Sequence, residues 1–381
     1  MKAIPLLLFN LLIFLAVSGQ TVETVVSHPK IIDGIHVDAA GNIYTSPGGL
    51  QGGSAIGKAT PDGVFEPNFR GGFNGPIDID EDADGRLFVT NYDNNTLKSY
   101  DPLSDELTTV VTGLDGPAGL TFDDGGNIFL TCFGAPPAYN GDQIIKVLPD
   151  GSSEIWLETS DFLRPQGITF DDEGNLWVAN TPTGKIFKID TITKVPVLML
   201  ELGNKVGNLV FRKKDRLLYF PSQGNHRIYR MDLMGNLDTL AGTGSIGSVD
   251  GAAMSSTFNK PLGLGFTASE DTLYVAEEGK LRRIFGLDEV ATQTISREAH
   301  PIKIFPNPSL GNIRVEIPEQ MQNRPNRLTL CDAVGRLKLE RNIQEDESSI
   351  VLENIEKGTW YLKFYSTMPS GNFFVEKLFV F

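Results

Sequence analysis

One acidic segment of the chain carries carboxylates at the spacing of a calcium loop. Asp80, Asp82 and Asp84 alternate and Gly85 follows them, which is how an EF-hand loop begins. The twelfth position of that loop should be a bidentate Glu, but Asn91 stands there. Two interpretations remain, an irregular surface calcium site and an ordinary acidic turn, and the internal repeat described next favours the turn.

The residues around this segment recur along the chain with a regular period. The position held by Asp78 is held elsewhere by glycine or asparagine, and successive copies lie 41 to 55 residues apart. The six copies are Gly34, Asp78, Gly119, Gly167, Asn208 and Gly263. Each begins an apolar strand, which an acidic-glycine turn and a second strand follow. This period and strand content are typical of a β-propeller, so we expect an all-β fold with six four-stranded blades.

A propeller must join its first and last blades. The apolar stretch 22–26 precedes the first repeat, and we expect it to complete the last blade, which removes an exposed sheet edge. The propeller is predicted over residues 20–286.

The repeat also predicts which polar residues meet at one mouth of the central channel. Adjacent strands of a blade are antiparallel, so the start of the first lies near the end of the second. The candidates are Asp33, His36, Asp78, Asn91, Gln166, Asn180, Asn208 and Glu277, with Asp78 expected beside Asn91. These carboxylates and amides would either bind calcium or another divalent metal or line a water-filled channel, and we favour the channel.

Other catalytic patterns are missing from the sequence. The four histidines, His28, His36, His226 and His300, show no zinc-ligand spacing, and no G-x-S-x-G nucleophile motif occurs.

The segment 225–266 contains N-x-R-I, A-G-T-G, G-x-x-D-G-x-A and F-x-x-P-x-G-L in that order. In this it resembles the NHL repeat family, which implies a six-bladed propeller and no single function.

The chain is also similar to the gluconolactonase, senescence-marker and luciferin-regenerating group. That resemblance implies a divalent metal in the channel, with Asp33, Asn180 and Asn208 as the matching ligands. Asp33-Gly34 resembles the family's D-G motif, but no first-blade E-G-P is present. A metal-activated water attacking a lactone is therefore the alternative function. Because the ligand set is incomplete, we expect a binding module without enzymatic activity, whose ligand is an extracellular glycan, peptide or protein.

Two features indicate export. Residues 1–19 combine Lys2, an apolar run and small residues, as a signal peptide does, and no apolar segment long enough to span a membrane follows. The formal net charge of −15 disfavours a nucleic-acid partner.

Residues 287–300 are expected to be a linker or a last outer strand. For residues 301–381 the sequence predicts a small antiparallel β-sandwich. This tail resembles the type A sorting domain of the type IX secretion system. The matching residues are Pro306, Asn307, Pro308, Gly311, Gly335 and Gly358. The resemblance implies passage through the periplasm and recognition by the type IX machinery of a Bacteroidetes-type bacterium. The product would be secreted or held at the outer-membrane surface.

Overall fold

The computed structural model describes residues 19–48, 52–288, 303–305, 311–316, 326–332, 337–343, 348–366 and 373–380. The chain divides into two compact units, Met1–Ala291 and Thr292–Phe381. The predicted signal peptide, except Gly19, and most of the predicted linker lie outside the described residues.

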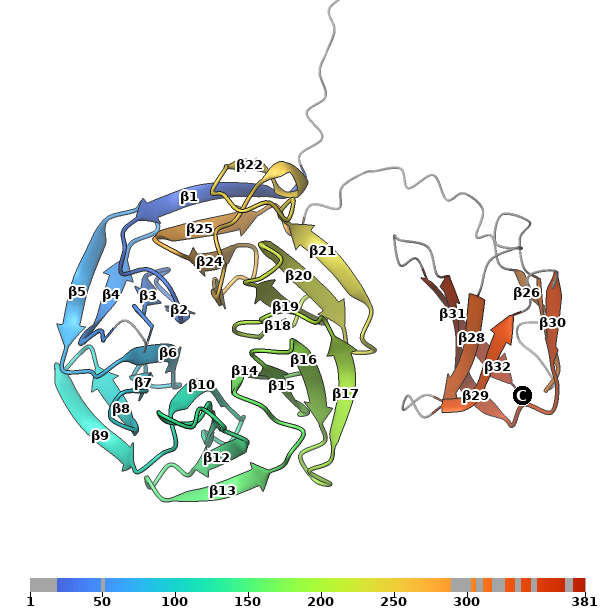
Figure 1. Cartoon of the computed structure of the whole chain (residues 1–381), viewed down its shortest axis with the longest axis horizontal. Coiled ribbons are helices and arrows are strands. Elements are labelled where there is room, and N and C mark those ends of the chain that lie inside the picture. Colours follow the sequence, from blue (N-terminus) through green and yellow to red (C-terminus); the bar gives the residue numbers. More distant parts are fainter. Residues whose placement is uncertain are drawn as a thin grey trace, which may run out of the picture. The chain divides into compact units, whose positions relative to one another are not determined.

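The N-terminal unit is a ring of six antiparallel sheets, shown in Figure 1, and the predicted six-bladed propeller is confirmed. Blade one consists of β2 (Ile35–Val37), β3 (Ile43–Thr45), β4 (Ala55–Ala59) and β5 (Phe65–Gly71). Blade two consists of β6 (Pro76–Glu81), β7 (Leu87–Asn91), β8 (Thr96–Asp101) and β9 (Glu106–Thr112). Blade three consists of β10 (Pro117–Phe122), β11 (Ile128–Cys132), β12 (Gln143–Val147) and β13 (Ser153–Glu158). Blades four and five are β14 (Pro165–Phe170), β15 (Leu176–Asn180), β16 (Lys185–Ile189) and β17 (Pro196–Glu201); and β18 (Val210–Arg212), β19 (Leu217–Ser222), β20 (Arg227–Asp232) and β21 (Leu237–Ala241). The first strand of each blade faces the channel.

The sixth blade joins the two ends of the propeller sequence. It consists of β23 (Gly263–Phe266), β24 (Leu273–Glu277), β25 (Lys280–Phe285) and, as its outer strand, β1 (Thr21–Ser27). β1 pairs antiparallel with β25, which confirms the predicted closure. The short strand β22 (Gly251–Ala252) covers the other edge of β1.

The acidic turns between first and second strands are held by their own aspartates. In blade two, Asp82 Oδ1 accepts the backbone N–H groups of Asp84 and Arg86. Gly85 takes a positive φ of 83°, which favours glycine. Asp38, Asp123 and Asp171 accept from the equivalent backbone of their own turns. The segment that resembled a calcium loop is therefore a hairpin turn of the repeat.

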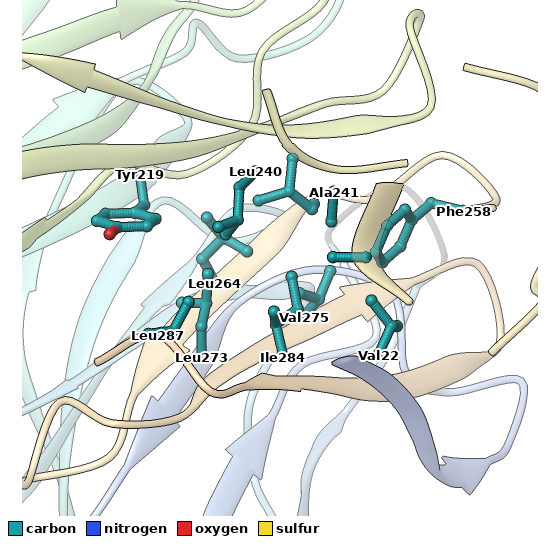
Figure 2. Packing of buried hydrophobic residues seen from close by; sticks show 12 residues of the cluster. Val22, Tyr219, Leu240, Ala241, Phe258, Leu264, Leu273, Val275, Ile284 and Leu287 are labelled. Atoms are coloured by element: carbon teal, nitrogen blue, oxygen red, sulfur yellow. The ribbon is translucent and has the colours of Figure 1, made fainter. Parts of the chain in front are cut away.

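Apolar side chains fill the spaces between blades. Figure 2 shows one such cluster, where Val22 of β1 packs with residues of blades five and six, including Tyr219, Leu240, Leu264 and Ile284. All five side chains are almost fully buried. The N-terminal strand thus contributes to the core as well as to the hydrogen-bonded edge.

The C-terminal unit is a β-sandwich, as predicted. One sheet has the order β26 (Lys303–Phe305), β27 (Ile313–Glu316), β30 (Ser349–Leu352). The other has the order β29 (Leu337–Ile343), β28 (Asn326–Asp332), β31 (Gly358–Ser366), β32 (Phe373–Val380). Their facing side chains, among them Val315, Leu330 and Trp360, form one core. Gly311 and Gly358 of the predicted sorting motif have positive φ angles, whereas Pro306, Asn307, Pro308 and Gly335 lie outside the described residues.

Candidate functional site in the central channel

The starts of the first strands approach each other so closely that most have no room for a side chain. A Cβ added to Gly119 would lie 1.9 Å from the carbonyl oxygen of Gln166 in the next blade. A Cβ on Gly263 would lie equally close to the carbonyl oxygen of Asp33. Such contacts explain why glycine recurs at this position of the repeat. Only blades two and five place a side chain there.

Those two side chains bind each other across the channel. Asn208 Nδ2 of blade five donates to Asp78 Oδ1 of blade two at 3.3 Å. The backbone N–H of Leu120 donates to the second carboxyl oxygen of Asp78 at 3.1 Å. Blades two and five are opposite in a ring of six, so this pair spans the diameter.

A second pair spans a neighbouring diameter, from blade one to blade four. Gln166 Nε2 donates to Asp33 Oδ1 at 2.9 Å, and the Thr181 hydroxyl donates to Gln166 Oε1 at 3.3 Å. We call the four residues Asp33, Asp78, Gln166 and Asn208 the channel plug. All four are under 9% exposed.

Burial sets the protonation of the plug. It raises the pKa of Asp78 to about 8, a shift that the hydrogen bond from Leu120 reduces and the nearby Asp33 increases. Burial also raises the pKa of Asp33 to about 7, against the opposing effects of Lys205 and Gln166. The pKa of Lys205 is lowered, because burial outweighs its attraction to Asp33. The plug therefore holds two carboxyl groups that titrate near neutral pH.

Next to the plug, the channel contains a cavity of about 230 Å³, which is lined by residues from all six blades, Asp78 and Asn208 of the plug among them. His36 lies on its wall with Asp80. The His36 Nδ1 atom is 3.3 Å from Asp80 Oδ1, and Nε2 is 2.9 Å from Glu81 Oε2. Burial opposes protonation of His36, but the bonds and charges of Asp80 and Glu81 prevail and raise its pKa to about 9. The imidazole is therefore charged at neutral pH.

The structure places Asn91 and Asn180 away from the plug. A shift of register in β6 pairs Asn91 with Pro76, so the expectation that Asp78 lies beside Asn91 is wrong. Thr90 faces Asp78 instead, its hydroxyl accepting the Asp78 N–H at 3.0 Å. The Asn91 side chain accepts the N–H of Asn74, in the loop that leads into β6.

Asn180 likewise binds the loop that leads into its own blade, blade four. Its Oδ1 accepts the N–H of Leu163, and its Nδ2 donates to the carbonyl oxygen of Asp161. The repeated asparagine at the second-strand end is a loop anchor, which the repeat alone did not distinguish from a channel ligand.

Glu277 belongs to a buried ion pair in blade six. Its Oε1 lies 2.9 Å from Nη1 of Arg282, and both side chains are completely buried. Arg282 also contacts Asp250 at 2.6 Å and lies over the ring of Phe258. The G-x-x-D-G motif thus supplies an aspartate that holds its long loop to blade six, so Glu277 stabilises this loop.

The plug does not fit the metal that the gluconolactonase resemblance implies. A divalent metal would need the amide oxygens of Gln166 and Asn208. Gln166 Oε1 instead accepts from Thr181, and Asn208 Oδ1 accepts the N–H of Leu209 at 2.8 Å. Both amides present their NH₂ groups to the carboxyl groups. Nor do the described parts of the chain contain a metal-binding group of three or more His, Cys, Asp or Glu residues.

Three participants were not anticipated as site residues. The position of Lys205 near the channel could have been predicted from the repeat, because it lies three residues before Asn208. Asp80 lies two residues after Asp78, so strand alternation places the two side chains on the same face of β6, whereas the contact of Glu81 with His36 is evident only from the structure.

Comparisons with known proteins agree with both units. Residues 303–378 match the family model of the secretion system C-terminal sorting domain. No curated protein matches the chain. Among solved structures, a protein of unknown function from Bacteroides thetaiotaomicron is 12% identical, with a TM-score of 0.59, covering 70% of this chain and 76% of that one.

Two further solved structures have the same fold. An auxiliary nutrient binding protein from Bacteroides ovatus is 16% identical with a TM-score of 0.58, covering 70% of this chain and 76% of its own. A gluconolactonase from Xanthomonas campestris is 16% identical with a TM-score of 0.54, and the match covers 69% of this chain and 88% of that one. These identities establish the fold of the propeller alone.

In the described part of the chain no helix is long and apolar enough to cross a membrane. The tail, residues 303–378, is a secretion system C-terminal sorting domain, and it directs this propeller through type IX secretion to the cell surface or the extracellular space.

Proposed function

We propose that this exported propeller is a ligand-binding protein, and that its channel cavity takes a small polar molecule. The observation that carries the proposal is the pair of His36 and Asp80 on the wall of the cavity, with Glu81 bonded to the other ring nitrogen of His36. Charged groups held in a concavity are the usual determinants of ligand orientation.

The chemistry of the wall indicates the ligand class. The cluster combines one imidazolium with two carboxylates, so it is acidic overall and accepts hydrogen bonds from hydroxyl or ammonium groups. Thr121 and Thr169 add hydroxyl groups, and Phe211 and Phe266 add apolar surface. A cavity of about 230 Å³ is smaller than a drug-sized site, which favours a sugar or an amino compound of similar size.

Similar solved structures support this proposal at the level of the fold. Two of them are auxiliary nutrient binding proteins, from Bacteroides ovatus and Bacteroides thetaiotaomicron. The lactonase alternative has less support, because both plug amides direct their oxygens away from the carboxyl groups.

The test is isothermal titration calorimetry of the full chain against neutral monosaccharides, amino sugars and amino acids. For a compound that binds, D80N should weaken affinity about tenfold, the usual effect of losing a hydrogen bond to a charged group. D84N is the matched control. It makes the same charge change in the same blade, and the Asp84 side chain is 82% exposed.

The proposal fails if no compound of the three classes binds. It also fails if D84N weakens binding as much as D80N, because the effect would then reflect net charge rather than the cavity.

A further inference from the structure

One position of the repeat carries a basic residue in three consecutive blades. It lies three residues before the repeat position at the channel. Its occupants from blade one to blade six are Ile31, Gly75, Gly116, Arg164, Lys205 and Lys260. Three cations at one structural position are notable in a chain with a net charge of −15.

The backbone at this position is unfavourable for two of these basic residues. Gly75 and Gly116 have φ angles of 57° and 63°, which glycine adopts freely. Arg164 and Lys260 adopt the same region, each with a φ of 51°. Residues other than glycine rarely adopt this left-handed backbone region. The basic residues therefore stand at positions where glycine would have a more favourable backbone conformation.

Lys205 is the member closest to the plug. Its side chain is half-buried, and its charge interacts with Asp33 and Lys260. Among the described residues no carboxylate lies within ion-pair distance of Lys205, and no hydrogen bond from its ammonium group is found. Asp33 is already hydrogen-bonded by Gln166. The ammonium group of Lys205 thus retains donors for a ligand.

The opposite side of the mouth is aromatic. Arg164 lies over the rings of Phe133 and Tyr139, with its guanidinium carbon 6.0 Å and 5.8 Å from their centroids. These two rings pack with Tyr92 against Ile77, which directly precedes Asp78 in the plug. Arg164 has no carboxylate partner within ion-pair distance in the described part of the chain.

We propose that this mouth is a second binding site, which takes the anionic oxygen group of a small molecule at Lys205. Arg164 lies at its aromatic wall, and Lys260 is a further cation that the anion would share with Glu278, its ion-pair partner at 2.8 Å. The anion is a carboxylate or a phosphate, and the aromatic wall receives the rest of the ligand. This site lies on the other side of the plug from the cavity, and it does not depend on the function proposed for that cavity.

The test is calorimetric titration of the full chain with citrate and, separately, with inorganic phosphate, at constant ionic strength. We expect saturable binding of at least one anion with a Kd of about 1 mM or below. K205M should weaken it about tenfold. K213M is the control, since Lys213 is an exposed lysine of the neighbouring blade-five turn and makes the same charge change.

K260G separates ligand binding from folding. Glycine suits the backbone at this position, so the variant should keep or raise the melting temperature while it weakens anion binding at least twofold. Citrate or phosphate alone would identify the anion. Absence of saturable binding to both would overturn the proposal, as would an equal loss of affinity in K213M or unchanged affinity in K260G.

Discussion

Two carboxyl groups, Asp33 and Asp78, are buried in the channel plug with neutral amides as their cross-channel partners. An amide stabilises an ionised carboxylate less than a cation would, so desolvation dominates and the pKa values rise to about 7 and 8. Lys205 moderates this effect only for Asp33. The plug is therefore most stable when at least one of its two carboxyl groups is protonated.

This has a consequence for stability that D78N can measure. The folded-state pKa of Asp78, about 8, lies above the ordinary value of 3.8 for an aspartate carboxyl. Stability from this group is complete below pH 3.8 and is lost as the pH rises to about 8. Asn cannot ionise, so D78N should become more stable relative to the wild type as the pH rises from about 5 to about 8.5, by up to roughly 4 kcal/mol.

Urea denaturation at both pH values gives the comparison, with D84N as a control whose carboxyl is exposed. An identical pH dependence for D78N and wild type would show that Asp78 ionises freely in the folded protein.

At the scale of the element, the first strands are set by backbone contacts at the channel. Glycine at their starts lets one strand touch the carbonyl group of the next, and asparagines at the second-strand ends fix the incoming loops. The same repeat position carries Asp78 and Asn208 where side chains are accommodated. The same repeat position thus holds a glycine for close strand packing in four blades and a polar side chain of the plug in the other two.

Gly119→Ala tests the packing role. Its Cβ would lie 1.9 Å from the carbonyl oxygen of Gln166, so blades three and four would have to separate. We expect a loss of roughly 3 kcal/mol or more in the free energy of unfolding, measured by chemical denaturation. Gly71→Ala in β5 is the control, because its nearest neighbour would be 3.8 Å away and its φ is not positive. Equal losses in the two variants would contradict the explanation.

For the whole propeller, stability depends on closing the ring with the first strand of the chain. β1 supplies hydrogen bonds to β25 and places Val22 in the core shared by blades five and six. Without it, β25 would be an open edge able to pair with other chains.

Two outer-strand valines test the contribution of closure. Val22 of β1 is fully buried, whereas Val197 of β17 is 54% exposed. Val22→Ala should cost roughly 2 kcal/mol in the free energy of unfolding, and Val197→Ala less than about 0.5 kcal/mol. Thermal and urea unfolding of the full chain provide the measurement. A Val22→Ala variant as mild as Val197→Ala would mean that closure contributes little.

Much of the architecture was predictable because it rests on local signals repeated six times. The period located Gly34, Asp78 and their equivalents, the turn aspartates explained the acidic segment, and the tail motif identified the sorting domain. The exact register was less predictable, since the bulge in β6 that moves Asn91 away from Asp78 arises from pairing within the blade.

By itself, the sequence determined the blade number, the closure strand, the export tail and a set of candidate residues for the channel. Only the tertiary structure decided which of them act together. Asp78 meets Asn208 and Asp33 meets Gln166 because opposite blades face each other across a ring, at separations of 130 and 133 residues. Asn91, Asn180 and Glu277 share the same sequence signal, yet their side chains turn to loops and to Arg282. A repeat specifies position along each blade, whereas the direction of a side chain depends on the neighbours that satisfy it.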